Sequence, residues 1–241
     1  MVMNLPRRCA PGIVAITAVF VVAAAHAASD PEIEKLLKKL PAPEKLVKPD
    51  QRVLRVNDPA LRDPLTNEIQ LATRRQQFKR ALELTRKLDA RYPKSPAAHA
   101  LRGMFAMALR NFSEASAAFR NAVAVQPEFA FCHYGIAAAE YQQRHYSAAL
   151  PHARRVTQLE PRAAAAWVFL SMCAEAAGNR QESLSAARRL TTLAPREPAA
   201  WVRLSKAEEA MGNRVAATQA LRRAVDAARA RSAARPAPRT R

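Results

Sequence analysis

The sequence predicts an all-α fold made of about five tandem helix–turn–helix units, and three observations support this prediction. Pro93, Pro127, Pro161 and Pro195 are spaced by 34 residues each, and each follows an apolar run with helical periodicity. The stretch 130–162 matches the sequence on either side of it when it is shifted by the same distance. Alanine is abundant and only 5 residues are glycine, a composition that favours helix because alanine loses little conformational entropy there.

Composition and charge narrow the class of protein. The chain has 241 residues, of which 49% are hydrophobic; this is enough for a core and too much for a wholly disordered protein. The formal net charge is +19, mostly from arginine, and the sequence pI is ≈ 11.1. Such a chain attracts polyanions: nucleic acid, anionic lipid headgroups, lipopolysaccharide or acidic proteins. Composition alone does not choose among them.

Residues 1–27 have the layout of a secretory signal peptide. Two arginines precede the apolar run 13–25, and Ala25-His26-Ala27 presents small residues at the two positions that a signal peptidase reads. We therefore expect cleavage after Ala27 and an exported, periplasmic protein. The alternative is an uncleaved helix that anchors the chain in the inner membrane, because the uncharged stretch 9–29 is long enough to span a bilayer.

The connector 28–61 differs in amino-acid composition from the rest of the chain. A short helix is expected at 31–40, with proline in its first turn and acids ahead of lysines. The following segment, PAPEKLVKPDQ, contains three prolines and is expected to be extended. The connector is interpreted as a spacer. The alternative is a segment that packs on the first repeat.

Removal of the signal peptide would leave Cys132 and Cys173 as the two thiols of the mature chain. In the 34-residue register they lie in the first helices of adjacent units, offset along the helix axis by roughly 10 Å at 1.5 Å per residue. A disulfide needs Cα atoms within about 7 Å of each other. We therefore expect two buried free thiols.

The repeat units are expected at 62–95, 96–129, 130–163, 164–197 and 198–231, and they share columns of residues at fixed positions. A column of mostly ring-bearing residues near the start of each first helix contains Leu65, His99, His133, Trp167 and Trp201. A column of mostly small residues follows, at Ile69, Gly103, Ala137, Ser171 and Ser205. Small residues allow paired helices to approach, and Gly or Asn between the two helices permits a left-handed turn.

With this period and these columns, the chain resembles the tetratricopeptide repeat (TPR) family from Arg62 to about Arg231. The resemblance implies a right-handed α-solenoid with a concave groove, which the first helix of each repeat lines. The terminal repeats depart from the family pattern, as repeats with one face toward water do. Residues 232–241 are rich in arginine and proline and lack acids, so we expect a disordered basic tail there.

The columns that would face the groove are apolar and aromatic at the centre and charged toward the C-terminal end. They predict a binding site for an extended peptide or an amphipathic helix of another protein, with Tyr134 and Tyr141 as anchors and Arg203 and Lys206 meeting an acidic end. The alternative is that these residues pack against the chain's own N-terminal segment or close a tight superhelix. The candidate groove residues are Met104, Met107, Phe131, Tyr134, Tyr141, Val168, Phe169, Met172, Arg203 and Lys206.

A second candidate surface is an arginine ladder on the second helices, where one register position is arginine in all five repeats and is mostly followed by another basic residue. It suggests contact with anionic lipid or lipopolysaccharide; the alternative is a solvated helix face. Binding to nucleic acid is disfavoured, because aromatic residues are not interleaved with the ladder. The candidate anion-binding residues are Arg86, Arg120, Arg154, Arg155, Arg188, Arg189, Arg222 and Arg223.

No motif in the sequence predicts catalysis, a cofactor or a metal site. A phosphate-binding glycine loop and a nucleophile motif are both missing. His99 and His133 share a packing column and are interpreted as core residues, because a metal site needs three or four convergent ligands. We expect a non-enzymatic interaction scaffold of the bacterial cell envelope. The alternatives are an electrostatic binder of envelope polyanions and an accessory subunit of an envelope synthesis or secretion complex. The sequence predicts no oligomeric state.

Overall fold

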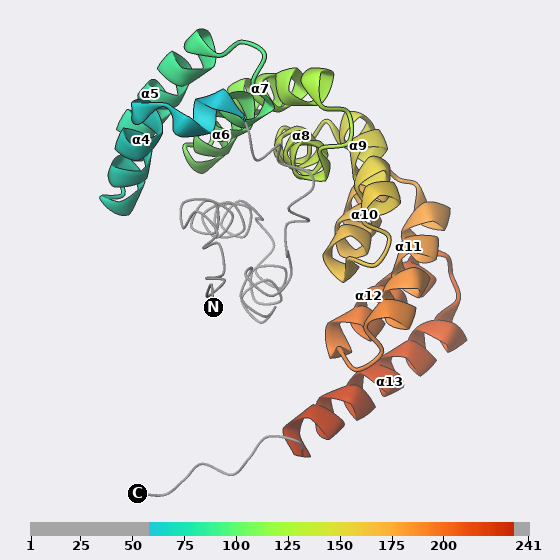
Figure 1. Ribbon diagram of the computed structural model, residues 1–241. Coiled ribbons are helices and arrows are strands. Elements are labelled where there is room, and N and C mark those ends of the chain that lie inside the picture. The colour runs from blue at the N-terminus through green and yellow to red at the C-terminus, as the bar shows by residue number, and fades with distance from the viewer. Residues whose placement is uncertain (1–57, 234–241) are drawn as a thin grey trace, which may run out of the picture. The chain divides into compact units, whose positions relative to one another are not determined.

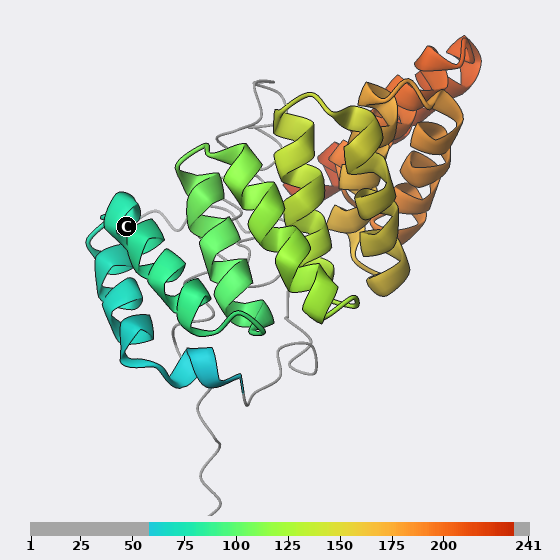
Figure 2. The ribbon, with the colours of Figure 1, turned by 90° about the horizontal axis from the view of Figure 1, so that it is seen from above.

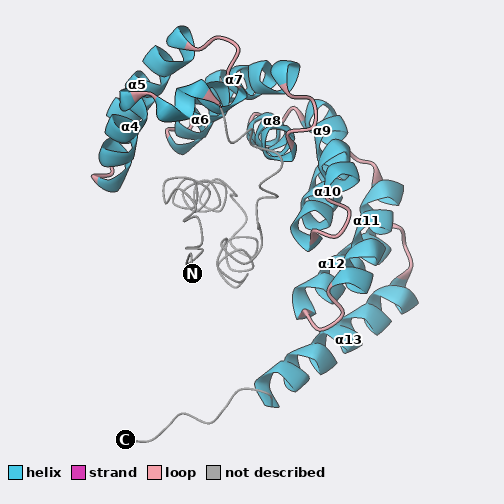
Figure 3. Cartoon of the chain, in the orientation of Figure 1, coloured by secondary structure: helices cyan, strands magenta, loops and turns pink. Residues whose placement is uncertain are grey.

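The computed structural model describes residues 58–233 (Figure 1). The predicted signal peptide, most of the connector and the last eight residues of the predicted tail lie outside the described residues. Every regular element within residues 58–233 is a helix, joined to the next by a short loop (Figure 3). The elements are η1 (Pro59–Arg62), α4 (Pro64–Arg74), α5 (Phe78–Arg91), α6 (Pro96–Ala108), α7 (Phe112–Val125), α8 (Ala130–Gln142), α9 (Tyr146–Leu159), α10 (Ala164–Ala176), α11 (Arg180–Leu193), α12 (Pro198–Ala210) and α13 (Arg214–Ala233).

The chain forms two compact units, and the boundary between them falls within α8, after Gly135. In the first unit, α4 packs on α5, α5 on α6 and α6 on α7. In the second unit, α9 packs on α10, α10 on α11, α11 on α12 and α12 on α13. Helices that follow each other along the chain therefore lie side by side within each unit (Figure 2). The predicted all-α fold of about five helical hairpins is confirmed.

The starts of several helices are fixed by side-chain caps. Ser95 precedes α6, and its hydroxyl accepts a hydrogen bond from the amide of Ala98 at 3.0 Å. Before α11, the side chain of Asn179 accepts a hydrogen bond from the amide of Glu182 at 3.1 Å and donates one to the Glu182 carboxylate at 2.8 Å. Such caps satisfy amide groups that have no partner inside the helix and so set where each helix begins.

One residue in each repeat has a left-handed backbone between the two helices. In the last two repeats it is a glycine: Gly178 with φ 77° and Gly212 with φ 82°. In the first three repeats it is Gln76, Arg110 or Arg144, with φ between 57° and 63°. The sequence indicated Gly or Asn as the residues that permit this turn; the last two repeats use Gly, whereas the first three place Gln or Arg there. Their turns tolerate a residue with a Cβ at some conformational cost.

The core of the first unit is built around Phe119 of α7, which is fully buried. A Cβ built on Gly103 of α6 would lie 2.7 Å from its ring, and one on Gly135 of α8 would lie 2.5 Å from it. Phe131 packs edge-on against the same ring, with the ring centroids 5.9 Å apart. The two glycines therefore provide the space that the largest residue of this core position needs.

The second unit has smaller residues at the equivalent positions. Leu184 and Ala187 of α11 pack against Ala207 of α12, together with the partly buried Leu204. The hydroxyls of Ser171 and Ser183 are 3.1 Å apart and form a buried hydrogen bond between α10 and α11. Small side chains thus bring these helices close without a large aromatic residue between them.

Residues 58–61, assigned to the connector from the sequence, are part of the folded first unit. The buried carboxylate of Asp58 accepts hydrogen bonds from the Ser95 hydroxyl at 2.7 Å and from the amides of Ala60 at 3.0 Å and Ala97 at 3.2 Å. It therefore caps η1 and also binds the start of α6. At the other end of the chain, α13 continues to Ala233, beyond the predicted end of the fifth repeat at Arg231.

Two further properties apply to residues 58–233 alone. No helix among them is both long enough and apolar enough to cross a membrane, and no group of three or more His, Cys, Asp or Glu side chains is arranged to hold a metal ion. Cys132 and Cys173 are both free and fully buried, which confirms the sequence prediction for these two thiols.

Candidate functional site

In the second unit, the predicted groove residues of α8 and α10 form a partly exposed apolar surface. The side chains of Tyr141, Val168 and Met172 are half-buried, whereas Phe169 is buried. The ring of Tyr141 lies 6.4 Å from that of Phe169 and packs edge-on at 5.1 Å against Tyr146. Burial raises the pKa of the Tyr141 hydroxyl. Ring contacts on two sides hold Tyr141 in place, which favours a preformed surface.

The charged end of this surface lies on α12. The Arg203 guanidinium donates a hydrogen bond to the Glu175 carboxylate at 2.7 Å, and the Arg203 side chain is only 12% exposed. Lys206, one turn further along α12, is exposed. The sequence predicted that Arg203 and Lys206 together meet an acidic ligand. Glu175 already neutralises Arg203, and Lys206 is the more exposed of the two cations.

The predicted groove residues of the first unit are more buried than those of the second. Met104 and Met107 of α6 are 6% and 3% exposed and contribute to the core. Phe131 is half-buried, and its ring lies 5.9 Å from the rings of both Phe119 and Phe129. Tyr134 is also half-buried. Tyr134 and Phe131 therefore retain exposed surface, whereas the two methionines present little to a ligand.

Three arginines of the predicted ladder form ion pairs with glutamates of the neighbouring repeat. Arg86 donates two hydrogen bonds to Glu114, at 2.8 and 2.6 Å, and Arg154 donates two to Glu182, at 2.6 and 2.7 Å. Arg188 donates to the buried carboxylate of Glu208 at 2.9 Å. Each of these glutamates belongs to the repeat that follows the arginine. The pairing lowers the positive charge that the ladder offers to an anionic surface.

The second arginine of each ladder pair contacts its own repeat. The guanidinium of Arg189 lies 6.0 Å from the ring centroid of Trp167, and that of Arg223 lies 4.9 Å from the centroid of Trp201. Arg155 donates to the Gln158 side chain at 3.2 Å. These arginines keep their charge, but two of them cover indole faces in cation–π contacts. Of the remaining ladder residues, Arg120 and Arg222 are exposed.

The ring-bearing column at the start of the first helices has one shared role. The indole N–H of Trp167 donates to the Pro161 carbonyl at 3.0 Å, and that of Trp201 donates to the Pro195 carbonyl at 2.9 Å. His99 makes the equivalent contact with Pro93 through Nε2 at 3.0 Å, as does His133 with Pro127 at 2.9 Å. The column therefore binds the loop before each first helix, and both histidines are buried, as the sequence predicted.

A network of five charged side chains links α5, α6 and α7. Arg102 donates to Glu114 at 2.9 Å and to Asp89 at 3.0 Å. Glu114 also accepts from Arg86, and the other oxygen of Asp89 forms an ion pair with Nδ1 of His99. Hydrogen bonds from Arg86 and Arg102 lower the pKa of Glu114 to about 2. The hydrogen bond to Asp89 raises the pKa of His99. The network stabilises the first unit and has no exposed reactive group.

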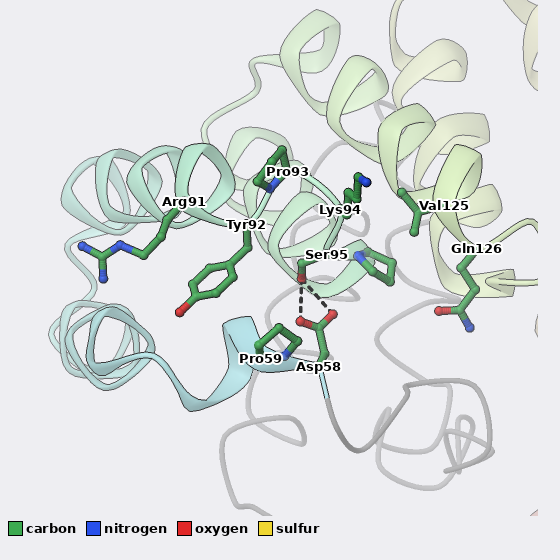
Figure 4. A pocket seen from close by; sticks show the side chains of 10 residues that line it. Asp58, Pro59, Arg91, Tyr92, Pro93, Lys94, Ser95, Val125 and Gln126 are labelled. Carbon is green, nitrogen blue, oxygen red and sulfur yellow. Dashed lines mark hydrogen bonds between the residues drawn. The ribbon is translucent and has the colours of Figure 1, made fainter.

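A cavity of about 490 Å³, which the sequence did not predict, lies in the first unit beside the loop between α5 and α6 (Figure 4). Its floor includes the Asp58 carboxylate, which is fully engaged by the Ser95 hydroxyl and by backbone amides. Arg91 and Tyr92 at its edge both donate to Asp63, at 2.7 and 2.9 Å. Prolines, Tyr92, Lys94, Val125 and Gln126 supply the remaining walls. Because Asp58, Arg91 and Tyr92 already bind polar groups of the protein, these three side chains offer little to a specific ligand.

Comparison with known proteins identifies the fold. No family model and no curated protein matches the chain. Several solved structures do. One MamA protein superposes with a TM-score of 0.67 at 16% identity, covering 73% of this chain and 96% of that one. MamA from Desulfovibrio magneticus RS-1, from residue 41 to its end, gives 0.63 at 18% identity, with 69% and 94% covered. YrrB, described as a TPR protein with an unusual peptide-binding site, gives 0.61 at 22% identity, with 70% and 91% covered.

The chain has a TPR fold. At these identities, the likeness establishes the architecture only. It agrees with the period and columns from which the TPR resemblance was inferred. The TPR first helices carry the apolar surface of the second unit, and the TPR second helices carry the ladder. Sequence reasoning missed the pairing of the ladder with glutamates 20 or 28 residues ahead. A signal for it was present, because Glu114 and Glu182 occupy one register position.

Proposed function

We propose that this TPR protein is a non-enzymatic interaction scaffold of the bacterial cell envelope, and that it binds a peptide or helix of another protein on the first helices of its second unit. The observation that carries the proposal is the partly exposed apolar surface of Tyr141, Val168 and Met172, with the exposed Lys206 at its charged end. Exposed apolar surface of this kind favours binding. Tyrosine and methionine suit it, because tyrosine loses little entropy and methionine adapts its shape.

The fold gives this proposal support of a general kind. YrrB, which superposes on this chain, is described as having a peptide-binding site. In the present chain a preformed site is favoured by the ring contacts of Tyr141 and by the ion pair that fixes Arg203. A ligand would place an apolar side chain against Tyr141 and Met172 and an acidic group near Lys206.

The envelope location rests on the signal peptide predicted at 1–27. N-terminal sequencing of the protein recovered from the periplasm of an expressing bacterium tests it. A mature chain that begins at Ala28 supports export and cleavage. A full-length chain in the cytoplasm would overturn the location and leave the binding surface to be tested separately.

The binding surface is tested by a photo-crosslinking amino acid placed at Met172 in living cells, with mass spectrometry of the adduct. The matched control carries the same amino acid at Ser185, an exposed position on the second helix of the same repeat. A peptide from the captured protein is then titrated against Tyr141→Ala and Met172→Ala. We expect each variant to bind about tenfold more weakly, as central apolar contacts of an interface do. Capture at both positions alike, or unchanged affinity of both variants, would refute the site.

Binding to anionic surfaces through the ladder is less well supported by the structure. Glutamates of the following repeats neutralise Arg86, Arg154 and Arg188. A preformed anion site would need several cations that converge without acidic partners. Vesicles that contain anionic lipid distinguish the two proposals, because contact through the ladder would weaken steeply with added salt.

A further inference from the structure

The last helix, α13, exposes a face that the following repeat covers elsewhere in the chain. Leu221 and Val225 are 48% and 50% exposed. The residues at the position of Leu221 in the other four repeats are Thr85, Phe119, Ala153 and Ala187, and all four have 0% exposure. At the position of Val225, Asp89, Thr157 and Thr191 are also buried, at 8%, 6% and 8%, and Val123 is half-buried. The position of Leu221 is therefore a core position in the other four repeats, and that of Val225 is buried in three of them; both lose their cover at α13.

The first unit shows what covers this face. Phe119, at the position of Leu221, lies against Gly103 of its own repeat and Gly135 of the next one. The cover is therefore the first helix of a following hairpin. Within the described residues no helix follows α13. Leu221 is larger than Ala153 and Ala187 and, like Phe119, would require a small residue opposite it.

Arg222 indicates that a partner on this face needs an acidic side chain as well as an apolar surface. At its register position, Arg86, Arg154 and Arg188 each bind a glutamate of the next repeat. Arg222 is exposed and forms no ion pair within residues 58–233. No repeat follows Arg222 within these described residues to supply the acid. An arginine beside exposed leucine and valine side chains fits a partner that carries an acid beside an apolar stripe.

We propose that the Leu221–Arg222–Val225 face of α13 binds a helical hairpin of another protein, with a small residue opposite Leu221 and a glutamate or aspartate that pairs with Arg222. The partner would extend the array by one repeat. This site is separate from the first-helix surface of the proposed function and does not depend on it.

Charge disfavours the occupants that this chain could supply itself. A second copy of α13 would bring Arg214, Arg222, Arg223, Arg229 and Arg231 against the same set, with Asp226 as the one acid in the helix. The N-terminal repeat of a second copy has Arg80 at the position of Glu114 and Glu182, so that it would meet Arg222 with a like charge. Residues 1–57 contain more basic than acidic residues. An acidic partner is therefore favoured over self-association.

The test attaches a hairpin of defined sequence to the full chain. The probe is a copy of residues 130–163, which supplies the glycine that faces Phe119 in its native place, with the substitution Ala148→Glu to supply the acid. A flexible Gly/Ser linker joins it to Arg241, which gives an effective concentration of about 1 mM. Hydrogen exchange of the α13 amides is the measurement. We expect docking to slow exchange about tenfold relative to the chain without the probe.

Variants of the exposed face decide whether the contact is the proposed one. Leu221→Ser and Arg222→Glu should each remove most of the protection, and Arg222→Glu should regain it with a probe that carries Ala148→Arg instead. The matched control is Val215→Ser. Val215 is exposed and apolar, but its equivalents Lys79, Ser113, Ser147 and Gln181 are exposed in every repeat. Unchanged exchange with the probe, or equal loss of protection in Val215→Ser, would overturn the proposal.

Discussion

Phe119 of α7 and Gly135 of α8 fit together so closely that the glycine has no room for a Cβ. A Cβ there would lie 2.5 Å from the ring, closer than real Cβ atoms approach their neighbours. Phe119 is fully buried and also contacts Phe131, so its ring cannot move toward solvent. This pair fixes the packing of α7 against the first turns of α8.

The contact predicts that Gly135→Ala destabilises the protein, although alanine is the better helix former. In an exposed helix the change would stabilise by roughly 1 kcal/mol. Here the clash should outweigh that gain and lower the free energy of unfolding by about 1–3 kcal/mol, the usual effect of overpacking. Urea unfolding followed by circular dichroism measures the difference.

The control is the same substitution in a Phe119→Leu background. Leucine leaves more space opposite position 135, so Gly135→Ala should cost less there than in the parent chain. Equal costs in the two backgrounds would show that the ring is not the cause.

Substitutions in the turns between paired helices should change the free energy of unfolding in opposite directions. Arg144 has φ 63° and Gly178, at the same position in the next repeat, has φ 77°. Residues with a Cβ adopt this conformation at a cost of about 1 kcal/mol. We therefore expect Gly178→Ala to lower the free energy of unfolding by about 1 kcal/mol and Arg144→Gly to raise it. The second effect should be small, because glycine also raises the conformational entropy of the unfolded chain.

Thermal unfolding of these two variants in parallel is the measurement. Nothing lies within 4 Å of a Cβ built on Gly178, so any loss there reports the backbone and not a steric clash. Two shifts of the same sign would contradict the interpretation of this position.

The sequence predicted the architecture well, because the features that carry it are local and periodic. The spacing of Pro93, Pro127, Pro161 and Pro195 marks the loops that precede the first helices. The backbone carbonyls of these four prolines accept hydrogen bonds from the side chains of the ring-bearing column. The burial of His99 and His133 followed from the same column. A repeat protein repeats its contacts as well as its residues, so the register carries over from one unit to the next.

Partners within the surfaces were harder to predict, because they depend on which side chains meet across neighbouring repeats. Arg154 reaches Glu182 in the next repeat, a distance along the chain at which helix-face rules give no expectation. The burial of Met104 and Met107 likewise depends on packing that a helical periodicity does not specify. The left-handed Arg144 was missed since its residue type does not favour that backbone.

The two buried thiols give a chemical prediction. Burial raises the pKa of Cys173 to about 12 and raises that of Cys132 as well. Because the thiolate is the reactive form, both should react with iodoacetamide at pH 8 far more slowly than an exposed cysteine does. The measurement uses a Cys9→Ser chain, in which Cys132 and Cys173 are the two remaining thiols. A second variant adds Ser185→Cys to this chain and provides an exposed reference thiol.

Mass spectrometry counts the modified thiols over time. The reference should be labelled in the folded state, and Cys132 and Cys173 only after urea is added. Rapid labelling of either one in the folded protein would show that its helix opens readily.

His99 gives a pH dependence whose sign follows from its partners. Its Nε2 lies 3.0 Å from the Pro93 carbonyl, which can only accept, and its Nδ1 forms an ion pair with Asp89. Both nitrogens therefore carry hydrogen in this arrangement, and the hydrogen bond to Asp89 raises the pKa of His99 above its ordinary value of 6.5. A raised folded-state pKa means that the folded chain binds this proton more tightly than the unfolded chain.

The stability that comes from protonated His99 should therefore be fully present below pH 6.5 and be lost as the pH rises through the raised pKa. We expect the difference in free energy of unfolding between the parent chain and His99→Gln to be larger at pH 6 than at pH 9. Urea unfolding at the two pH values measures it. The control is His133→Gln, which removes a buried histidine with the equivalent carbonyl contact. A difference for His99→Gln that is the same at both pH values, or that grows as the pH rises, would contradict the assignment of the charge to the His99–Asp89 pair.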